Sequence, residues 1–194
     1  MSRKVNALIA GLAAVFVSSG HAQAGRLLVV HDFSSSAEGW VVAGDTGPAV
    51  PVFHSSGGRD GGYISNTDEA GGETWYFQAP AAVLTQLAAA EGGRLAYSLK
   101  QDSADAGFRD DDVVIVGPAG RLSYRFDHAP GTEWTDFSVP LSASANWVWN
   151  WNARATPEQI RTVLSRPFRL EIRGEYRTGD DTGGIDHVVL TAGS

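Results

Sequence analysis

The sequence of 194 residues contains no cysteine. The chain therefore cannot form a disulfide, and a zinc site with thiolate ligands is excluded. After residue 17, no apolar run is long enough to cross a bilayer. Positive charge is scarce as well, because 15 basic residues stand against 22 acidic ones and give a net charge of −7. This balance disfavours nucleic acid and anionic membranes as partners, and it suits a neutral or cationic partner or a divalent cation.

The first 24 residues contain the three parts of a secretory signal peptide in the expected order. Arg3 and Lys4 form a positive start, residues 7–17 form an apolar core too short to span a membrane, and residues 22–24 (AQA) supply a small-x-small cleavage pattern. We expect cleavage near Ala24, a secreted or periplasmic mature protein, and one domain over residues 25–194. Without Arg3 and Lys4, 13 basic residues remain against 22 acidic ones, a net charge of −9.

Apolar and polar residues alternate in several short segments, a pattern typical of half-buried strands. The alternation occurs over residues 95–99, 122–126 and 168–172. Residues 113–116 (VVIV) predict a strand covered on both faces, and residues 185–190 predict a closing strand. Turns rich in glycine and proline separate these segments. Many short strands and little helix predict a β-sandwich or barrel.

Helix is predicted at two places only. Residues 156–159 (TPEQ) form a capping box with proline at the first helical position, and Pro167 ends the helix. Ile160, Val163 and Leu164 supply the apolar stripe of this helix. A weaker helical turn is predicted over residues 81–90, where Gly92 and Gly93 follow.

Five segments together resemble one known family of extracellular modules. They are residues 61–80 (GGYISNTDEAGGETWYFQAP), 95–100 (LAYSLK), 111–126 (DDVVIVGPAGRLSYRF), 131–141 (GTEWTDFSVPL) and 155–176. In this order they resemble the laminin B domain (laminin IV type A), over roughly residues 60–190. The resemblance implies an all-β fold, an antiparallel jelly-roll β-sandwich of the galactose-binding-like type with one or two short helices. It also implies an extracellular binding or structural module without a shared catalytic apparatus.

The same resemblance implies a structural calcium ion held by acids from distant loops. Jelly-roll binding modules similar to this chain place an early acid, a glycine-rich loop and an acid of the last strand around the ion. The matching residues are Asp32, Asp60 and Asp186, with Glu38 as a substitute for Asp32. The carbonyl oxygens near Gly58 and Tyr63 are further candidates, since calcium takes six to eight oxygen ligands. The alternative is that Asp60 forms a turn and that the other two acids lie on the surface.

Six tryptophans fall into two groups. Trp40, Trp75 and Trp134 lie in predicted strands or family-like motifs and are expected in the core. Trp147, Trp149 and Trp151 stand at every second position of residues 146–152 (NWVWNWN). In an extended strand all three project to one face. Together with Asn150 they would suit a carbohydrate, because aromatic rings pack on sugar rings and amides bind hydroxyls. The alternative is a hydrophobic lid anchored by Trp147.

Charged residues near the centre of the sequence offer a second set of ligand contacts. Arg109, Asp111, Arg121 and Arg125 could line a polar groove, and Arg125 faces outward in the predicted strand. Surface ion pairs are the alternative. The neighbouring run Asp110–Asp112 is a carboxylate cluster, but adjacent acids on a strand point apart. No catalytic residues are assigned, because no nucleophile motif or metal-ligand pair occurs.

These patterns leave three hypotheses for function. The first is a secreted, non-catalytic recognition module that binds carbohydrate or another extracellular partner, with no cofactor beyond a structural calcium ion. The second is a structural or adhesive protein that assembles through a sheet or an aromatic patch. The third is a glycan hydrolase that uses Asp111 and Asp112. The sequence does not determine the ligand or the oligomeric state.

Overall fold

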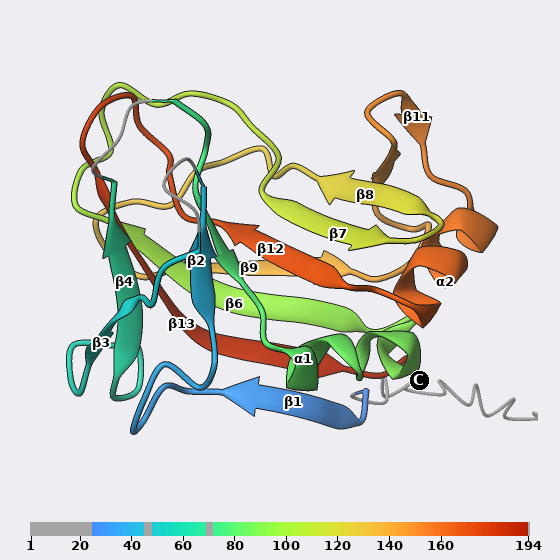
Figure 1. The fold of residues 1–194 in the computed structure, drawn as a ribbon, viewed down its shortest axis with the longest axis horizontal. Helices are drawn as coiled ribbons and strands as arrows, with labels where there is room; N and C mark the ends of the chain where they lie inside the picture. The colour runs from blue at the N-terminus through green and yellow to red at the C-terminus, as the bar shows by residue number, and fades with distance from the viewer. Residues whose placement is uncertain (1–24, 45–47, 69–71, 194) are drawn as a thin grey trace, which may run out of the picture.

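A computed structural model describes residues 25–44, 48–68 and 72–193 of the chain. Its strands pair antiparallel throughout these residues and form two sheets (Figure 1). The six-stranded sheet has the order β3 (Val52–His54), β4 (Tyr63–Thr67), β13 (Thr182–Thr191), β6 (Arg94–Gln101) and β9 (Thr135–Pro140), and β1 (Leu27–His31) also pairs with β13. The seven-stranded sheet has the order β11 (Ala153–Arg154), β10 (Val148–Trp149), β8 (Gly120–Tyr124), β7 (Val113–Gly117), β12 (Arg169–Arg173), β5 (Tyr76–Gln78) and β2 (Val41–Ala43). The predicted all-β jelly-roll sandwich is confirmed.

The core lies between the two sheets and follows the alternation of the sequence. Leu95, Tyr97 and Leu99 of β6 are buried and belong to one cluster with the inward residues of β7, β8 and β12. Trp40 and Phe33 are among the largest fully buried side chains of this cluster. Burial of a large apolar side chain contributes about 1.5–3 kcal/mol. A continuous core of this size stabilises the fold without disulfides.

Two short helical segments close one end of the sandwich (Figure 1). The first comprises α1 (Ala81–Leu84) and a 3-10 turn, η1 (Leu87–Ala90). The second, α2 (Pro157–Ser165), begins with the predicted capping box, in which Gln159 N donates to Thr156 Oγ1 and Thr156 N donates to Gln159 Oε1. Ile160, Val163 and Leu164 are buried, as the apolar stripe predicted.

Two aromatic residues differ from their predicted positions. Phe168 precedes β12 rather than opening it, and 58% of the residue is exposed. Trp134 is half-buried outside the core, where its Nε1 donates to Gly57 O at 3.1 Å. Tyr63 packs edge-on against Trp134, with 5.4 Å between the ring centroids. These rings differ from Trp40 and Trp75, which are buried as expected.

The predicted signal peptide and its cleavage site at residues 22–24 lie outside the described residues. Within the described ranges, no helix has the length and apolarity required to span a membrane.

Candidate functional site

The outer face of the seven-stranded sheet carries the polar residues of three central strands. Leu122 of β8 and Leu170 of β12 point into the core, so their neighbours along each strand point outward. The outward residues are Arg121 and Ser123 of β8, Val114 and Val116 of β7, and Arg169, Glu171 and Arg173 of β12. The strand register places Val114 between Ser123 and Glu171. One continuous surface therefore crosses the middle of the sheet.

This outer face is recessed at its centre. Val114 and Ser123 are each 2% exposed and Glu171 is 8% exposed, although none of them belongs to the core between the sheets. Burial raises the pKa of the Glu171 carboxyl, and the nearby Arg169 and Arg121 oppose this shift. Glu171 also pairs in register with Gln78 of β5, which extends the polar surface toward the sheet edge.

Asp111 connects two arginines at one side of the recess. Arg121 Nη2 donates to Asp111 Oδ2 at 2.8 Å, and Arg125 Nη2 donates to Asp111 Oδ1 at 3.1 Å. A cavity of about 260 Å³ lies here, lined by Asp111, Ser123, Arg125, Asn146, Val148 and Trp151. The structure thus brings together Asp111, Arg121 and Arg125 in ion pairs, as the alternative interpretation expected, and a ligand in this groove stays a prediction.

Arg109 is not part of this cavity. It is exposed and lines a separate cavity of about 80 Å³ with Phe108, His128 and Tyr176, which Arg125 also borders. Arg109 lies two residues before Asp111, ahead of β7, where strand alternation no longer determines the side of the sheet. The fourth residue of the predicted groove is therefore placed elsewhere.

The three tryptophans of residues 147–151 do not share one face, so this prediction was wrong in its geometry. The strand β10 ends at Trp149, and Asn150 and Trp151 have φ angles of 44° and 60°. Trp149 pairs with Ala153, so residues 150–152 form the hairpin loop. Within it, Asn152 N donates to Trp149 O at 3.0 Å and closes a β-turn whose two central residues are both in the left-handed region. The chain reverses where the prediction assumed that it stays extended.

Trp147 is buried in the core, so it is removed from any surface site. Only 1% of the residue is exposed, and its Nε1 donates to Pro140 O at 2.8 Å. This burial agrees with the alternative interpretation, in which Trp147 anchors a hydrophobic lid. Trp149 is half-buried and packs over Gly120, where an added Cβ would lie 2.4 Å from its ring.

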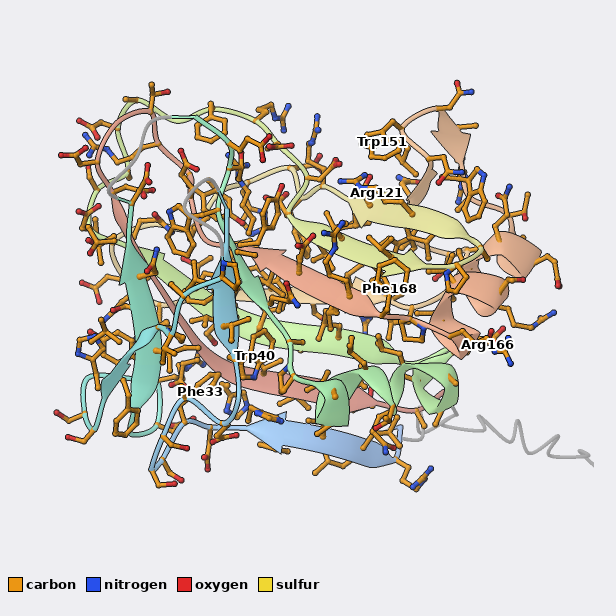
Figure 2. The ribbon with its side chains drawn as sticks, viewed as in Figure 1. Phe33, Trp40, Arg121, Trp151, Arg166 and Phe168 are labelled. Atoms are coloured by element: carbon orange, nitrogen blue, oxygen red, sulfur yellow. The ribbon has the colours of Figure 1, made fainter. Side chains whose placement is uncertain are left out.

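Trp151 is 74% exposed at the tip of the hairpin formed by β10 and β11 (Figure 2). Its ring lies over the Arg121 guanidinium, with 4.7 Å between Arg121 Cζ and the ring centroid. The turn is tied to β8, since Asn150 Oδ1 accepts from Arg121 N at 2.8 Å and Asn150 N donates to Arg121 O at 3.0 Å. A non-glycine residue in a rare backbone region costs about 1–3 kcal/mol, and such positions cluster at binding sites. The exposed ring is consequently held in place above the groove.

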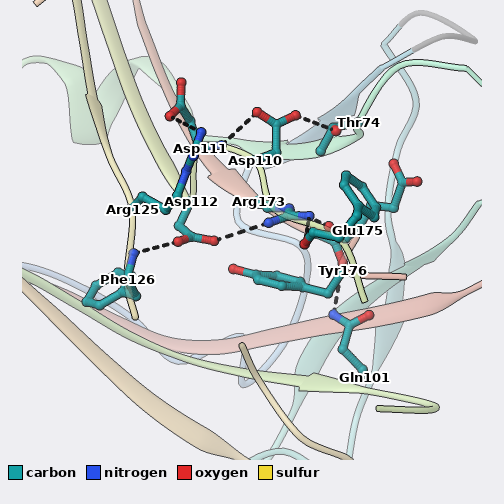
Figure 3. Close-up of polar contacts among 12 residues, drawn as sticks. Thr74, Gln101, Asp110, Asp111, Asp112, Arg125, Phe126, Arg173, Glu175 and Tyr176 are labelled. Carbon is teal, nitrogen blue, oxygen red and sulfur yellow. Dashed lines mark hydrogen bonds and ion pairs between the residues drawn. The ribbon is translucent and has the colours of Figure 1, made fainter. Parts of the chain in front are cut away.

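Each carboxylate of Asp110–Asp112 has different partners (Figure 3). Asp110 accepts from Thr74 Oγ1 at 2.6 Å, whereas Asp111 binds the two arginines. Asp112 is 3% exposed and accepts from Phe126 N at 2.7 Å, and its carboxylate lies 3.6 Å from Arg173 Nη1. Burial raises the pKa of Asp112. In a glycoside hydrolase, two carboxyl groups face the same glycosidic bond. The three acids here point in different directions and do not have this arrangement.

The predicted calcium ligands lie near the bulge of β13. Asp186 accepts from Arg59 N and from His187 N, both at 2.6 Å, while Asp60 faces His187 Nδ1 at 3.7 Å. Asp32 accepts from Ser34 N at 3.1 Å. The pKa of Glu38 is raised by burial first and then by the charges of Asp32 and Asp186, so these three acids are neighbours.

Backbone carbonyl oxygens also lie close to the Asp186 carboxylate. An added Cβ at Gly58 would lie 2.0 Å from Gly62 O and 2.7 Å from Asp186 Oδ2, and one at Gly62 would lie 2.1 Å from Phe33 O. No group of three or more His, Asp or Glu side chains in the described ranges is arranged to hold a metal ion. Calcium would therefore need these carbonyl oxygens as well as the acids, and its binding stays a prediction.

Several groove residues were not singled out from the sequence. The alternation of residues 168–172 predicts only that Glu171 and Arg169 lie on the polar side of a half-buried strand, and no pattern assigns Gln78 to a surface. The alternation of residues 168–172 carried the signal for β12. Which outward side chains become recessed depends on strand order, and a single sequence does not contain that order.

Two short helices beside two antiparallel sheets define this protein as a jelly-roll β-sandwich. Its sequence matches the family model of laminin B (domain IV) over residues 76–194. The match covers more than half of the sequence, so the chain belongs to the laminin B family. No curated protein matches the sequence.

Two solved structures illustrate the shared fold. The L4b domain of human laminin alpha-2 has a TM-score of 0.68 at 12% identity, and the alignment covers 86% of this chain and 97% of that one. A family 11 carbohydrate-binding module from Clostridium thermocellum, in complex with a β-1,3-1,4-mixed-linked tetrasaccharide, has a TM-score of 0.53 at 12% identity. That alignment covers 87% of this chain and 96% of the module. At such identities the similarity establishes the fold alone.

Proposed function

We propose that this chain is an exported, non-catalytic recognition module that binds a glycan on the outer face of its seven-stranded sheet. The observation that carries the proposal is Trp151, an exposed ring fixed above a recessed polar groove. A ring in this position offers a flat apolar surface to a sugar, and the carboxylates, guanidinium groups and amides of the groove offer hydrogen bonds. The family 11 module of similar fold, solved with a tetrasaccharide, agrees with this class of ligand.

The groove also indicates how strongly such a ligand binds. Glu171, Asp111 and Arg121 are already paired or buried, so their orientation is set before a ligand arrives. Preorganisation reduces the entropy lost on binding, but a shallow site buries little of the ligand. We therefore expect weak binding to one sugar and stronger binding to an oligosaccharide that spans the groove from Trp151 toward Gln78.

The test is a glycan array followed by calorimetry on the purified chain, with Trp151→Ala and Phe168→Ala compared. Both positions are exposed aromatics, but Phe168 does not line the cavity beside Trp151. Loss of the ring contact at Trp151 should weaken affinity about tenfold, which corresponds to about 1.4 kcal/mol. Phe168→Ala should bind as the wild type does.

Equal affinity of wild type and Trp151→Ala would contradict the proposed stacking role. Binding of an extracellular protein in place of every glycan on the array would contradict the ligand class. Hydrolysis of a bound oligosaccharide, abolished by Asp111→Asn, would contradict the non-catalytic assignment and favour the hydrolase alternative.

A further inference from the structure

Two arginines flank one residue of the central strand on the groove face. The register pairs Val116 of β7 with Arg121 of β8 on one side and with Arg169 of β12 on the other. Neighbouring strands lie about 4.8 Å apart, so the two arginine backbones are roughly 10 Å apart across the sheet. Their side chains rise from the same row of the outer face.

Each of the two guanidinium groups has one N–H donor that makes no hydrogen bond within the described residues. Arg121 donates through Nη2 to Asp111, but its Nη1 is buried and has no hydrogen-bond partner within the described part of the chain. Arg169 Nε is likewise buried and makes no hydrogen bond there, although it forms an ion pair with Glu171 Oε1 at 3.4 Å. A buried donor left without an acceptor destabilises the folded state, because it has lost its hydrogen bond to water. Two such donors in one row indicate that an acceptor from outside the chain completes the site.

The local charge is opposite to that of the whole protein. Around the row, Arg121, Arg125 and Arg169 stand against two acids, Asp111 and Glu171. The full sequence carries seven more acidic than basic residues. An excess of guanidinium groups on an acidic protein is selective for an anionic group that fits these positions, because the remaining surface repels anions.

We propose that the bound glycan is acidic and carries carboxylates, as chains of uronic acid residues do. The planar guanidinium fork matches a carboxylate in two parallel hydrogen bonds. Arg169, whose side chain is 43% exposed, receives a carboxylate directly, while Arg121 receives one beside the ring of Trp151. This inference rests on the proposed glycan function and names the class of glycan.

The experiment compares each acidic oligosaccharide with its own neutral form. Hexamers of galacturonate, mannuronate and guluronate are titrated into the purified protein by calorimetry, together with the same hexamers after reduction of their carboxyl groups. At least one acidic hexamer should bind tenfold more tightly than its reduced form. A sulfated dextran oligomer of equal length separates carboxylate recognition from general attraction to anions.

Two variants with the same change of charge locate the effect. Arg169→Gln should bring the ratio between acidic and reduced hexamers close to one. Arg94→Gln, on β6 of the other sheet, should leave the ratio unchanged, because Arg94 is exposed and far from the groove face. Loss of the ratio in both variants would mean that net charge, not the groove, controls binding, and would overturn the inference.

The possible failures are distinguishable. Equal affinity for acidic and reduced hexamers overturns the carboxylate inference and leaves glycan binding in place. Tighter binding of the sulfated oligomer than of any uronate also overturns it. Binding of no oligosaccharide, acidic or neutral, overturns the proposed function together with the inference.

Discussion

The outer faces of the two sheets both carry aromatic and charged residues, but they use them differently. On the six-stranded sheet, Lys100 Nζ lies 4.0 Å from the Tyr63 ring centroid and 4.7 Å from that of Trp134. His54 stacks on Tyr63 at 4.3 Å, and Trp134 donates to Gly57 O. On the seven-stranded sheet, Trp151 contacts Arg121 and is still 74% exposed. The rings of the six-stranded face contact one another beside a cavity of about 320 Å³ that Tyr63 and Lys100 line, whereas the Trp151 ring presents most of its surface to solvent.

The same contrast applies to hydrogen bonds. Near the six-stranded face, Asp136 accepts from Ser98 Oγ and from Arg59 Nη1, so this surface pairs its own charges. On the seven-stranded face, Arg121 and Arg169 each retain a buried N–H without an acceptor in the described ranges. The number of aromatic or charged residues on a face therefore does not identify a binding site. Groups that the fold positions but does not satisfy are the better indicator.

The largest expected effect concerns calcium, which would belong to the six-stranded side of the molecule. A ligand at a hundredfold excess over its dissociation constant stabilises the folded state by about 2.7 kcal/mol. Calcium should therefore raise the melting temperature relative to a chelator, and Asp186→Asn should abolish the rise. Asp136→Asn serves as the control, since Asp136 is on the same sheet and is no predicted ligand. If neither chelator nor excess calcium changes the melting temperature, the prediction of a calcium ion is wrong.

A smaller effect is expected from the Tyr63, Trp134 and Lys100 cluster. A cation–π contact at an exposed site contributes about 0.5–1 kcal/mol, so Lys100→Ala should lower the free energy of unfolding by about 1 kcal/mol in urea titrations. Lys100→Met keeps most of the side-chain packing and separates the charge from the hydrocarbon stem. Glycan affinity should be unchanged in both variants. A weaker glycan affinity in either variant would place the ligand on the six-stranded face and contradict the assignment of the site to the seven-stranded face.

The sequence predicts the parts of this fold that depend on short patterns. The strands β6, β7 and β8 follow from alternation or from a β-branched run, and α2 follows from its capping box. The pairing of Asp111 with Arg121 and Arg125 was also within reach, because all three residues lie on or beside one predicted hairpin. These features arise between residues that are close in the sequence.

The rest of the site depends on contacts that no local pattern encodes. The turn at Asn150 and Trp151 has two left-handed residues without a glycine, so the usual hairpin signal is absent. The pairing of β12 with β7 brings Arg169 and Glu171 beside residues more than fifty positions earlier. Trp147 is buried because it packs into the core between the sheets, and the alternation of residues 146–152 does not predict this burial.

The smallest expected effect concerns the protonation of one carboxyl group on each side of the molecule. Burial, followed by the charges of Asp68 and Asp181, raises the pKa of Glu175 to about 7, just after β12 of the seven-stranded sheet. On the six-stranded sheet, hydrogen bonds from Arg59 and Ser98 hold the pKa of Asp136 below its usual range. The folded state therefore binds a proton at Glu175 more tightly than the unfolded state does, whereas the opposite holds at Asp136.

The two sides consequently respond to pH in opposite directions. The contribution of Glu175 to stability grows as the pH falls from about 7 toward its ordinary value of 4.5. The contribution of Asp136 is complete in this range and is lost only as the pH falls below its ordinary value of 3.8. Melting temperatures between pH 8 and pH 5 should therefore depend less on pH in Glu175→Gln, while Asp136→Asn should keep the wild-type slope. Because Glu175 is partly exposed, solvent screening keeps the difference small. Parallel profiles for wild type and Glu175→Gln would show that water, not the protein interior, surrounds this carboxyl.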